Sequence, residues 1–184
     1  MSLTETPICN FGEKAKNFNL LSTENKKISL DNVKGKNGTL IMFICNHCPY
    51  VKAVIIDIVK DVKYLETLGI KSVAIMSNDV KNYPEDSFEN MISFSKTHNF
   101  TFPYLIDKTQ ETAKKFGAVC TPDFFGFNKN LELQYRGRIR ELKNLKPVGK
   151  GDSDLNIAMK LIATSGKGPK KQVPSMGCNI KWFK

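Results

Sequence analysis

Signals for membrane insertion and secretion are missing from this sequence of 184 residues. No uninterrupted run approaches the ~20 apolar residues that a membrane span requires. The opening segment, MSLTETPICNFGEKAK, has neither the basic start nor the apolar stretch of a signal peptide. We therefore expect a cytoplasmic protein that has no membrane partner. The length and a hydrophobic content of 41% predict a single domain, residues 1–184, with one sizeable core.

Arginine is scarce, although the formal net charge is +10. The only arginines are Arg136, Arg138 and Arg140, and the lysines are scattered through every segment, with one dense stretch, GKGPKK, at residues 166–171. No RNA-reading or helix-turn-helix signature accompanies this charge. The charge therefore predicts a solvated basic surface and no nucleic-acid partner. Such a surface favours the thiolate form of a nearby cysteine.

Cysteine is also sparse. The sequence has five cysteines, Cys9, Cys45, Cys48, Cys120 and Cys178. Their odd number and wide spacing do not fit the dense disulfide framework of a small secreted domain. Two of them, however, Cys45 and Cys48, have only two residues between them, in the stretch FICNHCPY, residues 43–50. We predict a reactive or metal-binding pair at this stretch and unpaired thiols elsewhere.

Short apolar runs alternate with amphipathic stretches along most of the chain. The runs predict strands at 39–44, 70–78 and 101–107, two short strands within 18–35 around a turn at 23–26, and a hairpin turning at 128–130. The amphipathic stretches predict helices at 49–69, 87–99, 109–117 and 152–166. This order predicts an α/β protein with a central mixed sheet flanked by helices. We expect a core at about 18–165 and a C-terminal tail at 166–184 that drapes over it.

The cysteine pair lies where a buried strand meets a helix. Pro49 suits the first turn of that helix, so Cys45 and Cys48 are expected near backbone N–H groups and the positive end of the helix dipole. This environment lowers the pKa of a thiol, and the thiolate is the nucleophile in thiol exchange. The two intervening residues let the second sulfur reach the first. We therefore predict a redox pair, with His47 between the sulfurs as a residue that stabilises the thiolate.

Other uses of the pair fit these residues less well. A structural zinc site needs four ligands, and no second close pair exists, so His47, Cys120 or Cys178 would have to complete it. Covalent haem attachment needs a histidine directly after the second cysteine, where Pro49 stands. A purely structural disulfide does not suit the reducing cytosol. We expect no metal and no other cofactor.

The stretch VCTPDFF, residues 119–125, is the second unusual feature. A proline entering a strand removes a hydrogen bond of the ladder, so Pro122 is expected at the first residue of a strand or in a cis turn. From the sequence alone, the trans form is the commoner state of such a bond.

Four stretches occur in a family-like order: CNHCPYVK, SNDVKNYPEDSFENM, FPYLIDKTQETAKKFGAVCTPDFFGF and PSMGCNIKW. Together they resemble the peroxiredoxin-like proteins of the thioredoxin superfamily, within the alkyl hydroperoxide reductase/thiol-specific antioxidant class. The resemblance covers about Phe18 to Trp182. It implies a thioredoxin-like fold and a redox-active centre with an antioxidant or disulfide-exchanging role. A non-catalytic module of this fold, either zinc-holding or an adaptor, is the alternative.

The thioredoxin side of the resemblance assigns roles within the pair. It implies that Cys45 attacks a disulfide and that Cys48 resolves the mixed disulfide. It also implies a cis-proline, Pro122, that faces the pair, and a substrate groove lined by Thr121 and Pro122. The resulting activity is thiol-disulfide exchange on protein or small-molecule disulfides, with a reducing thiol as the electron donor.

The peroxiredoxin side assigns the sulfurs differently. Peroxiredoxins carry a T-x-x-C pattern, and on that overlay Cys45 takes the threonine position while Cys48 becomes the peroxidatic residue, followed by Pro49. The implied activity is a thiol peroxidase that acts on peroxides, with Cys45 as the resolving thiol. The missing threonine is a departure, because its hydroxyl helps to orient the peroxide.

Three further residues depart from the parent families or have open roles. The usual tryptophan before the first cysteine is Ile44, and no acidic residue stands in TLIMFI to accept a proton, so water or His47 is expected to do so. Cys120 and Cys178 lie in family-like stretches. Either is a candidate third redox thiol if the fold brings it close, but we expect Cys120 to be a buried bystander and Cys178 a tail thiol.

Overall fold

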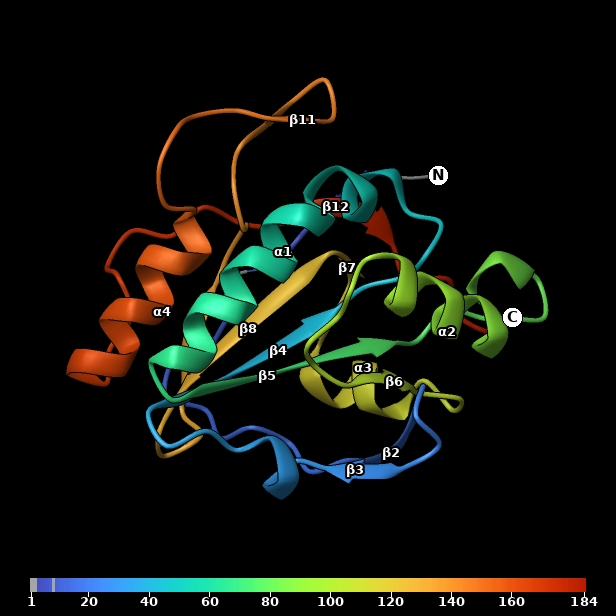
Figure 1. The fold of residues 1–184 in the computed structure, drawn as a ribbon, viewed down its shortest axis with the longest axis horizontal. Helices are drawn as coiled ribbons and strands as arrows, with labels where there is room; N and C mark the ends of the chain where they lie inside the picture. The colour runs from blue at the N-terminus through green and yellow to red at the C-terminus, as the bar shows by residue number, and fades with distance from the viewer. Residues whose placement is uncertain (1–2, 8) are drawn as a thin grey trace.

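The computed structural model describes residues 3–7 and 9–184, and Figure 1 shows their fold. The strands are β1 (Leu3–Glu5), β2 (Asn19–Ser22), β3 (Lys27–Ser29), β4 (Gly38–Phe43), β5 (Ile70–Met76), β6 (Tyr104–Ile106), β7 (Cys120–Thr121), β8 (Asp123–Asn128), β9 (Leu133–Arg136), β10 (Leu142–Lys143), β11 (Lys146–Pro147) and β12 (Met176–Asn179). The helices are α1 (Pro49–Thr67), α2 (Phe88–Thr97), α3 (Glu111–Phe116) and α4 (Asp154–Ser165), with short 3₁₀ turns η1 (Asp31–Val33) and η2 (Pro84–Asp86).

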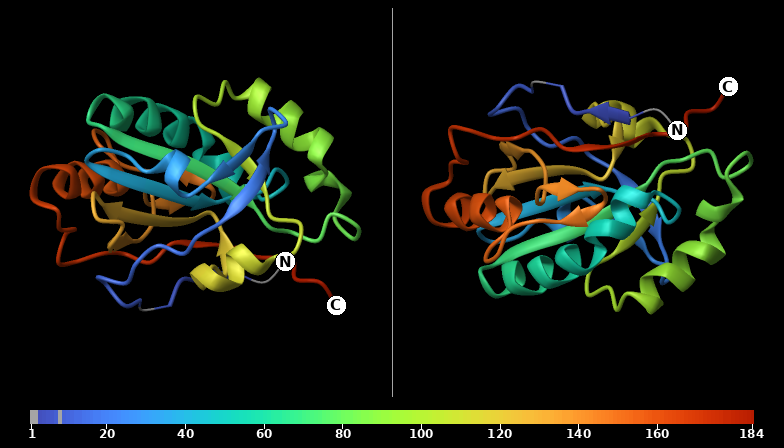
Figure 2. Two further views of the ribbon diagram at one scale, coloured as in Figure 1. Left: turned by 90° about the horizontal axis from the view of Figure 1, so that it is seen from below. Right: turned by 90° about the horizontal axis from the view of Figure 1, so that it is seen from above.

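A seven-stranded mixed sheet forms the centre of the molecule. Its order is β3-β2-β6-β5-β4-β8-β9. The β4–β5 and β5–β6 pairs are parallel, and the other neighbours are antiparallel. Figures 1 and 2 show α1 and α4 on one face of this sheet and α3 on the other. The predicted α/β architecture with a mixed sheet flanked by helices is therefore confirmed.

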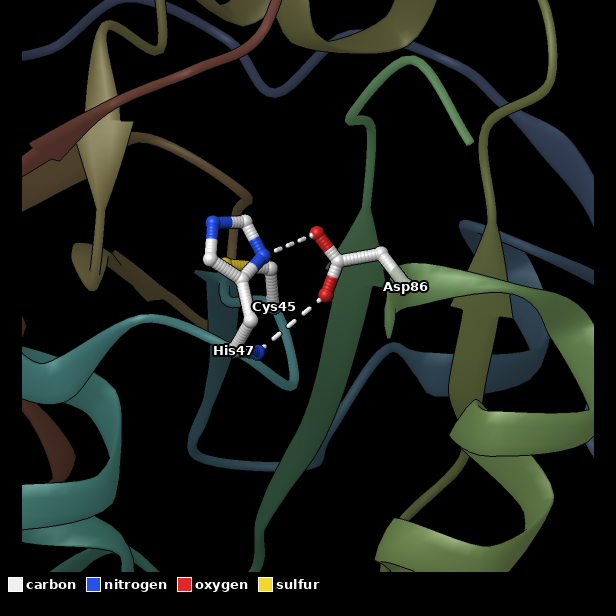
Figure 3. A group of neighbouring side chains, drawn as sticks. All are labelled: Cys45, His47 and Asp86. Carbon is white, nitrogen blue, oxygen red and sulfur yellow. Dashed lines mark hydrogen bonds and ion pairs between the residues drawn. The ribbon is translucent and has the colours of Figure 1, made fainter. Parts of the chain in front are cut away.

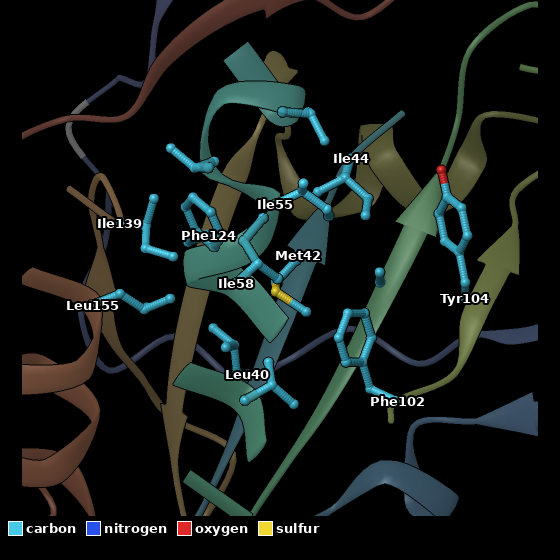
Figure 4. Close-up of a cluster of buried hydrophobic side chains, with 14 of the residues drawn as sticks. Leu40, Met42, Ile44, Ile55, Ile58, Phe102, Tyr104, Phe124, Ile139 and Leu155 are labelled. Atoms are coloured by element: carbon cyan, nitrogen blue, oxygen red, sulfur yellow. The ribbon is translucent and has the colours of Figure 1, made fainter. Parts of the chain in front are cut away.

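Strand β4 divides the core into two layers. Leu40 and Met42 contribute to the layer beneath α1 and α4, whereas Ile41 and Phe43 contribute to the layer on the α3 side. Successive side chains of a strand point to opposite faces, so a continuous apolar run fills both layers at once. Figure 4 shows part of the first layer. The run TLIMFI thus marks the strand at the centre of the sheet, and the redox pair follows directly after it.

Local sequence signals set the helix ends. Pro49 begins α1, Ser87 caps α2 by accepting a hydrogen bond from the Asn90 N–H, and Ser153 caps α4 by accepting one from the Asn156 N–H. These caps satisfy N–H groups that have no partner inside the helix. The predicted helices are therefore confirmed, with ends close to those expected.

The third predicted strand is shorter than expected. We predicted residues 101–107, but only Tyr104–Ile106 form β6. Pro103 has no N–H group to donate to a ladder, although its carbonyl accepts a hydrogen bond from the Ala74 N–H at 2.9 Å. The proline therefore ends regular pairing at that point.

The C-terminal segment is not a tail draped over a finished core. Its strand β12 pairs antiparallel with both β1 and β7 in a separate three-stranded sheet. Cys178 is part of one core layer and Ile180 of the other. The expected division into a core at 18–165 and a tail at 166–184 is therefore wrong. Residues at both ends of the chain complete the packing, and strands this short carry too little periodicity to be seen in the sequence.

None of the helices in residues 3–7 and 9–184 is both long enough and apolar enough to cross a membrane.

Candidate functional site

The two sulfurs of the C-x-x-C pair face each other at the start of α1. Cys45 follows β4, and Cys48 is the N-cap of α1. The Cys45 Sγ lies 3.3 Å from the Thr121 hydroxyl oxygen, and the Cys48 Sγ lies 3.1 Å from the Thr121 carbonyl oxygen. Each cysteine side chain also shifts the pKa of the other. Both residues are almost fully buried, with exposed fractions of 1% and 0%.

The two thiols have opposite acidities. A hydrogen bond from Cys45 lowers the pKa of Cys48 to about 5 against the effect of burial, and Cys178 and the Val51 backbone contribute further hydrogen bonds. Burial raises the pKa of Cys45 well above its usual value, and the hydrogen bond to Cys48 raises it further. A pair that loses one proton therefore holds the charge on Cys48. This distribution is the reverse of the order implied by the thioredoxin resemblance, in which Cys45 is the nucleophile.

The Thr121–Pro122 peptide bond is cis, as the resemblance implies. Pro122 stands between β7 and β8, which is also where a proline costs no ladder hydrogen bond. Both residues are buried, because β12 lies over them and the Ser175 hydroxyl donates to the Pro122 carbonyl at 2.6 Å. Their place in a substrate groove therefore stays a prediction, and neither residue is exposed to solvent in this structure.

An acidic residue that sequence reasoning missed lies beside the pair. Asp86, at the end of η2, is fully buried, and its Oδ2 lies 2.6 Å from Nδ1 of His47 (Figure 3). Its Oδ1 accepts hydrogen bonds from the backbone N–H groups of Asn46 and His47 at 2.8 and 3.2 Å. The turn containing Asp86 is 39 residues from His47, so no local pattern marks it. Its place in the family-like stretch SNDVKNYPEDSFENM is the only signal in the sequence.

The contact between His47 and Asp86 favours the charged form of both residues. The hydrogen bond to Asp86 raises the pKa of His47, although burial opposes it. Burial by itself raises the pKa of Asp86, but hydrogen bonds from His47 and Asn78 outweigh it and lower that pKa. The His47 ring is also stacked on Tyr83, with 5.8 Å between centroids and an interplanar angle of 10°. His47 is thus held in one orientation, close to Cys45.

Polar side chains from distant elements fix this arrangement. The Tyr104 hydroxyl donates to the Asn46 side chain at 3.0 Å, and the Asn78 amide donates to Asp86 at 2.8 Å. The Lys181 backbone N–H in turn donates to the Asn78 side chain at 2.8 Å. A buried network in which each member is satisfied holds its groups in a unique geometry. Here it ties the C-x-x-C loop to the C-terminal segment.

A metal ion is a second use of the same side chains. Cys45, His47 and Asp86 offer three ligand atoms within 4.8 Å of one another. A structural zinc site normally has four protein ligands. The Asp86 carboxylate already accepts hydrogen bonds from two backbone N–H groups, the Asn78 amide and the His47 ring. The arrangement therefore suits a hydrogen-bonded pair better than a zinc centre.

The remaining thiols lie in different environments. Cys120 is buried, as expected, its thiol lies 3.6 Å from the Pro122 carbonyl, and burial raises its pKa. The description of Cys178 as a tail thiol is wrong. Its side chain is buried, with an exposed fraction of 3%, and the residue pairs with Thr121 beside Cys48.

Replacing Asp86 by Asn is expected to lower the pKa of His47, because the largest raising contact disappears. In the native protein, the raised pKa of His47 contributes stability that is fully present below pH 6.5, the ordinary pKa of histidine. This stability is lost as the pH rises through the pKa of His47 in the folded protein. The free energy of unfolding of the variant should therefore differ less from the native value at high pH. An NMR titration measures both histidines, and His98, whose pKa is lowered only by burial, is the internal control. An unchanged His47 midpoint would contradict the assignment.

Three comparisons show what this chain is similar to among known proteins. Residues 11–141 match the model of the AhpC/TSA family. A conserved protein from Geobacillus kaustophilus has 38% sequence identity and a TM-score of 0.94, over 100% of this chain and 97% of that one. A hypothetical protein from Sinorhizobium meliloti 1021 has 33% identity and a TM-score of 0.90, over 98% of each chain. No curated protein matches the sequence significantly.

A more distant structural neighbour concerns the fold alone. A thiol:disulfide interchange protein of the thioredoxin family from Chlorobium tepidum TLS has 18% identity and a TM-score of 0.64, over 85% of this chain and 99% of that one. The mixed sheet and its flanking helices are thus those of a thioredoxin-like fold, as expected.

Proposed function

Because this chain belongs to the AhpC/TSA family of thiol-dependent oxidoreductases, we propose that it is a thiol-disulfide oxidoreductase whose Cys45 and Cys48 alternate between a dithiol and a disulfide. The contact of both sulfurs with Thr121, at 3.3 and 3.1 Å, is the observation that carries this proposal, since it brings the two partners of the future disulfide to one residue. The opposite pKa shifts of the two thiols leave the proton on Cys45 and the charge on Cys48. Cys48 is therefore the attacking sulfur in this proposal, and Cys45 resolves.

The reaction follows from these protonation states. The Cys48 thiolate attacks one sulfur of the substrate disulfide, forms a mixed disulfide and releases one substrate thiolate, which takes up a proton. Cys45 then loses its proton and attacks the Cys48 sulfur, and the second substrate thiol leaves. The substrate gains two electrons and two protons, and the enzyme ends as the Cys45–Cys48 disulfide. A reducing dithiol, or two monothiols, returns two electrons and two protons to restore the Cys45–Cys48 dithiol and is itself oxidised to a disulfide.

His47 and Asp86 have separate parts in this scheme. The negative charge on Cys48 raises the pKa of His47, so an imidazolium at His47 stabilises the thiolate in return. Asp86 raises the pKa of Cys45 and keeps that thiol protonated until the second step. It also orients the imidazole, so Asp86 is a positioning residue.

A thiol peroxidase is the second candidate, and the burial of Cys48 favours it. A peroxide is small, whereas a protein disulfide reaches Cys48 only if β12 moves away from Thr121 and Pro122. In this reaction the Cys48 thiolate attacks the peroxide, an alcohol or water leaves, and Cys48 becomes a sulfenic acid. The Cys45 thiol then condenses with the sulfenic acid, forming the same disulfide and releasing water.

The proposal is tested by oxidising the reduced protein separately with glutathione disulfide and with hydrogen peroxide. We expect glutathione disulfide to produce the Cys45–Cys48 disulfide, identified by mass spectrometry of the joined peptides. We also expect turnover of that substrate when dithiothreitol is supplied as the donor. Rapid oxidation by peroxide together with no reaction with glutathione disulfide would replace the proposed function by the peroxidase. If neither oxidant joins Cys45 to Cys48, both candidates are wrong.

A further inference from the structure

Three thiols, not two, meet at the start of α1. Strand β12 pairs with β7 so that Cys178 stands opposite Thr121, the residue that contacts both sulfurs of the C-x-x-C pair. All three cysteines belong to one buried cluster, and Cys178 lies near enough to Cys48 for each thiol to shift the pKa of the other. Cys48 therefore has a thiol neighbour on each of two sides.

The position of Cys178 is fixed by contacts along the C-terminal segment. The Ser175 hydroxyl donates to the Pro122 carbonyl at 2.6 Å, and the Lys181 backbone N–H donates to the Asn78 side chain at 2.8 Å. Between them, Gly177 lies so close to β7 that a Cβ atom there would be 2.1 Å from the Thr121 carbonyl oxygen. These contacts hold the strand at both ends, and Gly177, which has no Cβ atom, lets the strand lie close to β7. Cys178 is therefore held in a fixed position beside Cys48.

Cys120 provides a contrast within the same sheet. It adjoins Thr121 in β7 and is equally buried, but its thiol is directed to the Pro122 carbonyl at 3.6 Å. Neighbouring residues of a strand point to opposite faces, so Cys120 and Thr121 cannot both face the pair. Cys120 and Cys178 are both buried, so the feature that distinguishes Cys178 from Cys120 is its position beside Cys48.

We propose that Cys178 is a second resolving thiol for Cys48. This inference rests on the proposed function, because it needs Cys48 to carry a mixed disulfide or a disulfide. The Cys178 thiol loses its proton and attacks the Cys48 sulfur; the bond from Cys48 to its former partner breaks, and a Cys48–Cys178 bond forms. When the partner is a substrate, the substrate leaves as a thiol and the protein loses two electrons in all.

The same attack on the Cys45–Cys48 disulfide transfers the bond without net oxidation. Cys45 leaves as a thiolate and takes up the proton that Cys178 released. The protein then stays oxidised while Cys45 is again a thiol. The new bond links β12 to the first turn of α1, so the segment that covers Thr121 and Pro122 becomes covalently attached to the redox helix.

The test uses Cys45→Ser, which removes the first resolving thiol. The reduced variant is treated with glutathione disulfide, and the products are mapped by mass spectrometry. We expect a transient glutathione adduct on Cys48 followed by a Cys48–Cys178 disulfide. The matched variants are Cys45→Ser/Cys178→Ser, in which the adduct should persist about tenfold longer or more, and Cys45→Ser/Cys120→Ser, in which release should be unchanged.

Persistence of the adduct in Cys45→Ser itself, to the same extent as in Cys45→Ser/Cys178→Ser, would overturn the inference. Thermal melting of each variant shows whether it is folded, and the oxidised native protein supplies a readout without substitution. There, mass spectrometry of the joined peptides should find a fraction that carries the Cys48–Cys178 bond with Cys45 as a thiol, and no such fraction would count against the transfer. Turnover of the native protein with glutathione disulfide is measured separately. A failure of the proposed function is thereby distinguished from a failure of the inference that Cys178 resolves.

Discussion

Cys48→Ser is expected to abolish reaction with both disulfides and peroxides, with a loss of roughly a thousandfold or more, because it removes the sulfur that holds the negative charge. Cys45→Ser should retain the first chemical step at Cys48. Its multiple turnover should then depend on Cys178. The more fully Cys178 replaces Cys45 as the resolving thiol, the smaller the loss should be. Cys120→Ser is the matched control, since that thiol is buried nearby but does not hydrogen-bond either member of the pair.

The pH dependence provides a second check on the same assignment. The pKa of Cys48 is lowered to about 5, so alkylation of the native protein by iodoacetamide should fall only as the pH drops through that value. Cys45, whose pKa is raised well above the usual thiol value, should not react at neutral pH. Labelling of Cys45 before Cys48, with first-step activity surviving in Cys48→Ser, would restore the order implied by the thioredoxin resemblance.

Arg136→Met is expected to destabilise the fold by about 3–5 kcal/mol at neutral pH, because it leaves a buried carboxylate without its partner. Asp123 is fully buried, and the Arg136 guanidinium donates to it at 2.9 and 3.4 Å and to the Gly117 carbonyl at 2.7 Å. The guanidinium also lies 4.5 Å from the centre of the Phe125 ring. Urea denaturation of the native and variant proteins measures the loss.

The size of this loss should depend on pH in a definite direction. Burial raises the pKa of Asp123 to about 6, although Arg136 opposes it. The pKa of Asp123 is therefore higher in the folded protein than the value of 3.8 expected in the unfolded chain. This difference stabilises the fold fully below pH 3.8, and the contribution is lost as the pH rises through about 6. Without Arg136 the pKa rises further, so the cost of the substitution should be smaller at pH ~5 than at pH ~8.

The double variant Asp123→Asn/Arg136→Met is the control for charge. It keeps the shape of the Asp123 side chain but has no buried carboxylate, so it should be more stable than Arg136→Met at neutral pH and should lose the extra pH dependence. Equal destabilisation of Arg136→Met at both pH values would show that lost packing, not an unpaired charge, causes the effect.

Local patterns in the sequence predicted most of the framework. The continuous apolar run at 39–44 is typical of a central strand, and the structure places it there because one run fills both core layers. Pro49, Ser87 and Ser153 predicted helix starts because a helix start depends on groups within one turn of chain. The placement of Cys48 at a helix N-terminus followed from the same local rules.

Tertiary structure decided which residues complete the site around the C-x-x-C pair and which of the two sulfurs is charged. Asp86 reaches His47 across 39 residues, and β12 brings Cys178 to Thr121 from the far end of the chain. Such contacts depend on the path of the whole backbone, which no short pattern encodes. The acidity of each thiol then depends on these same contacts: donors gathered around Cys48 stabilise its thiolate, and burial with Asp86 nearby keeps Cys45 protonated. The sequence by itself determined that two thiols stand ready to exchange, and the fold decided which one carries the charge, because hydrogen bonds and burial set that balance.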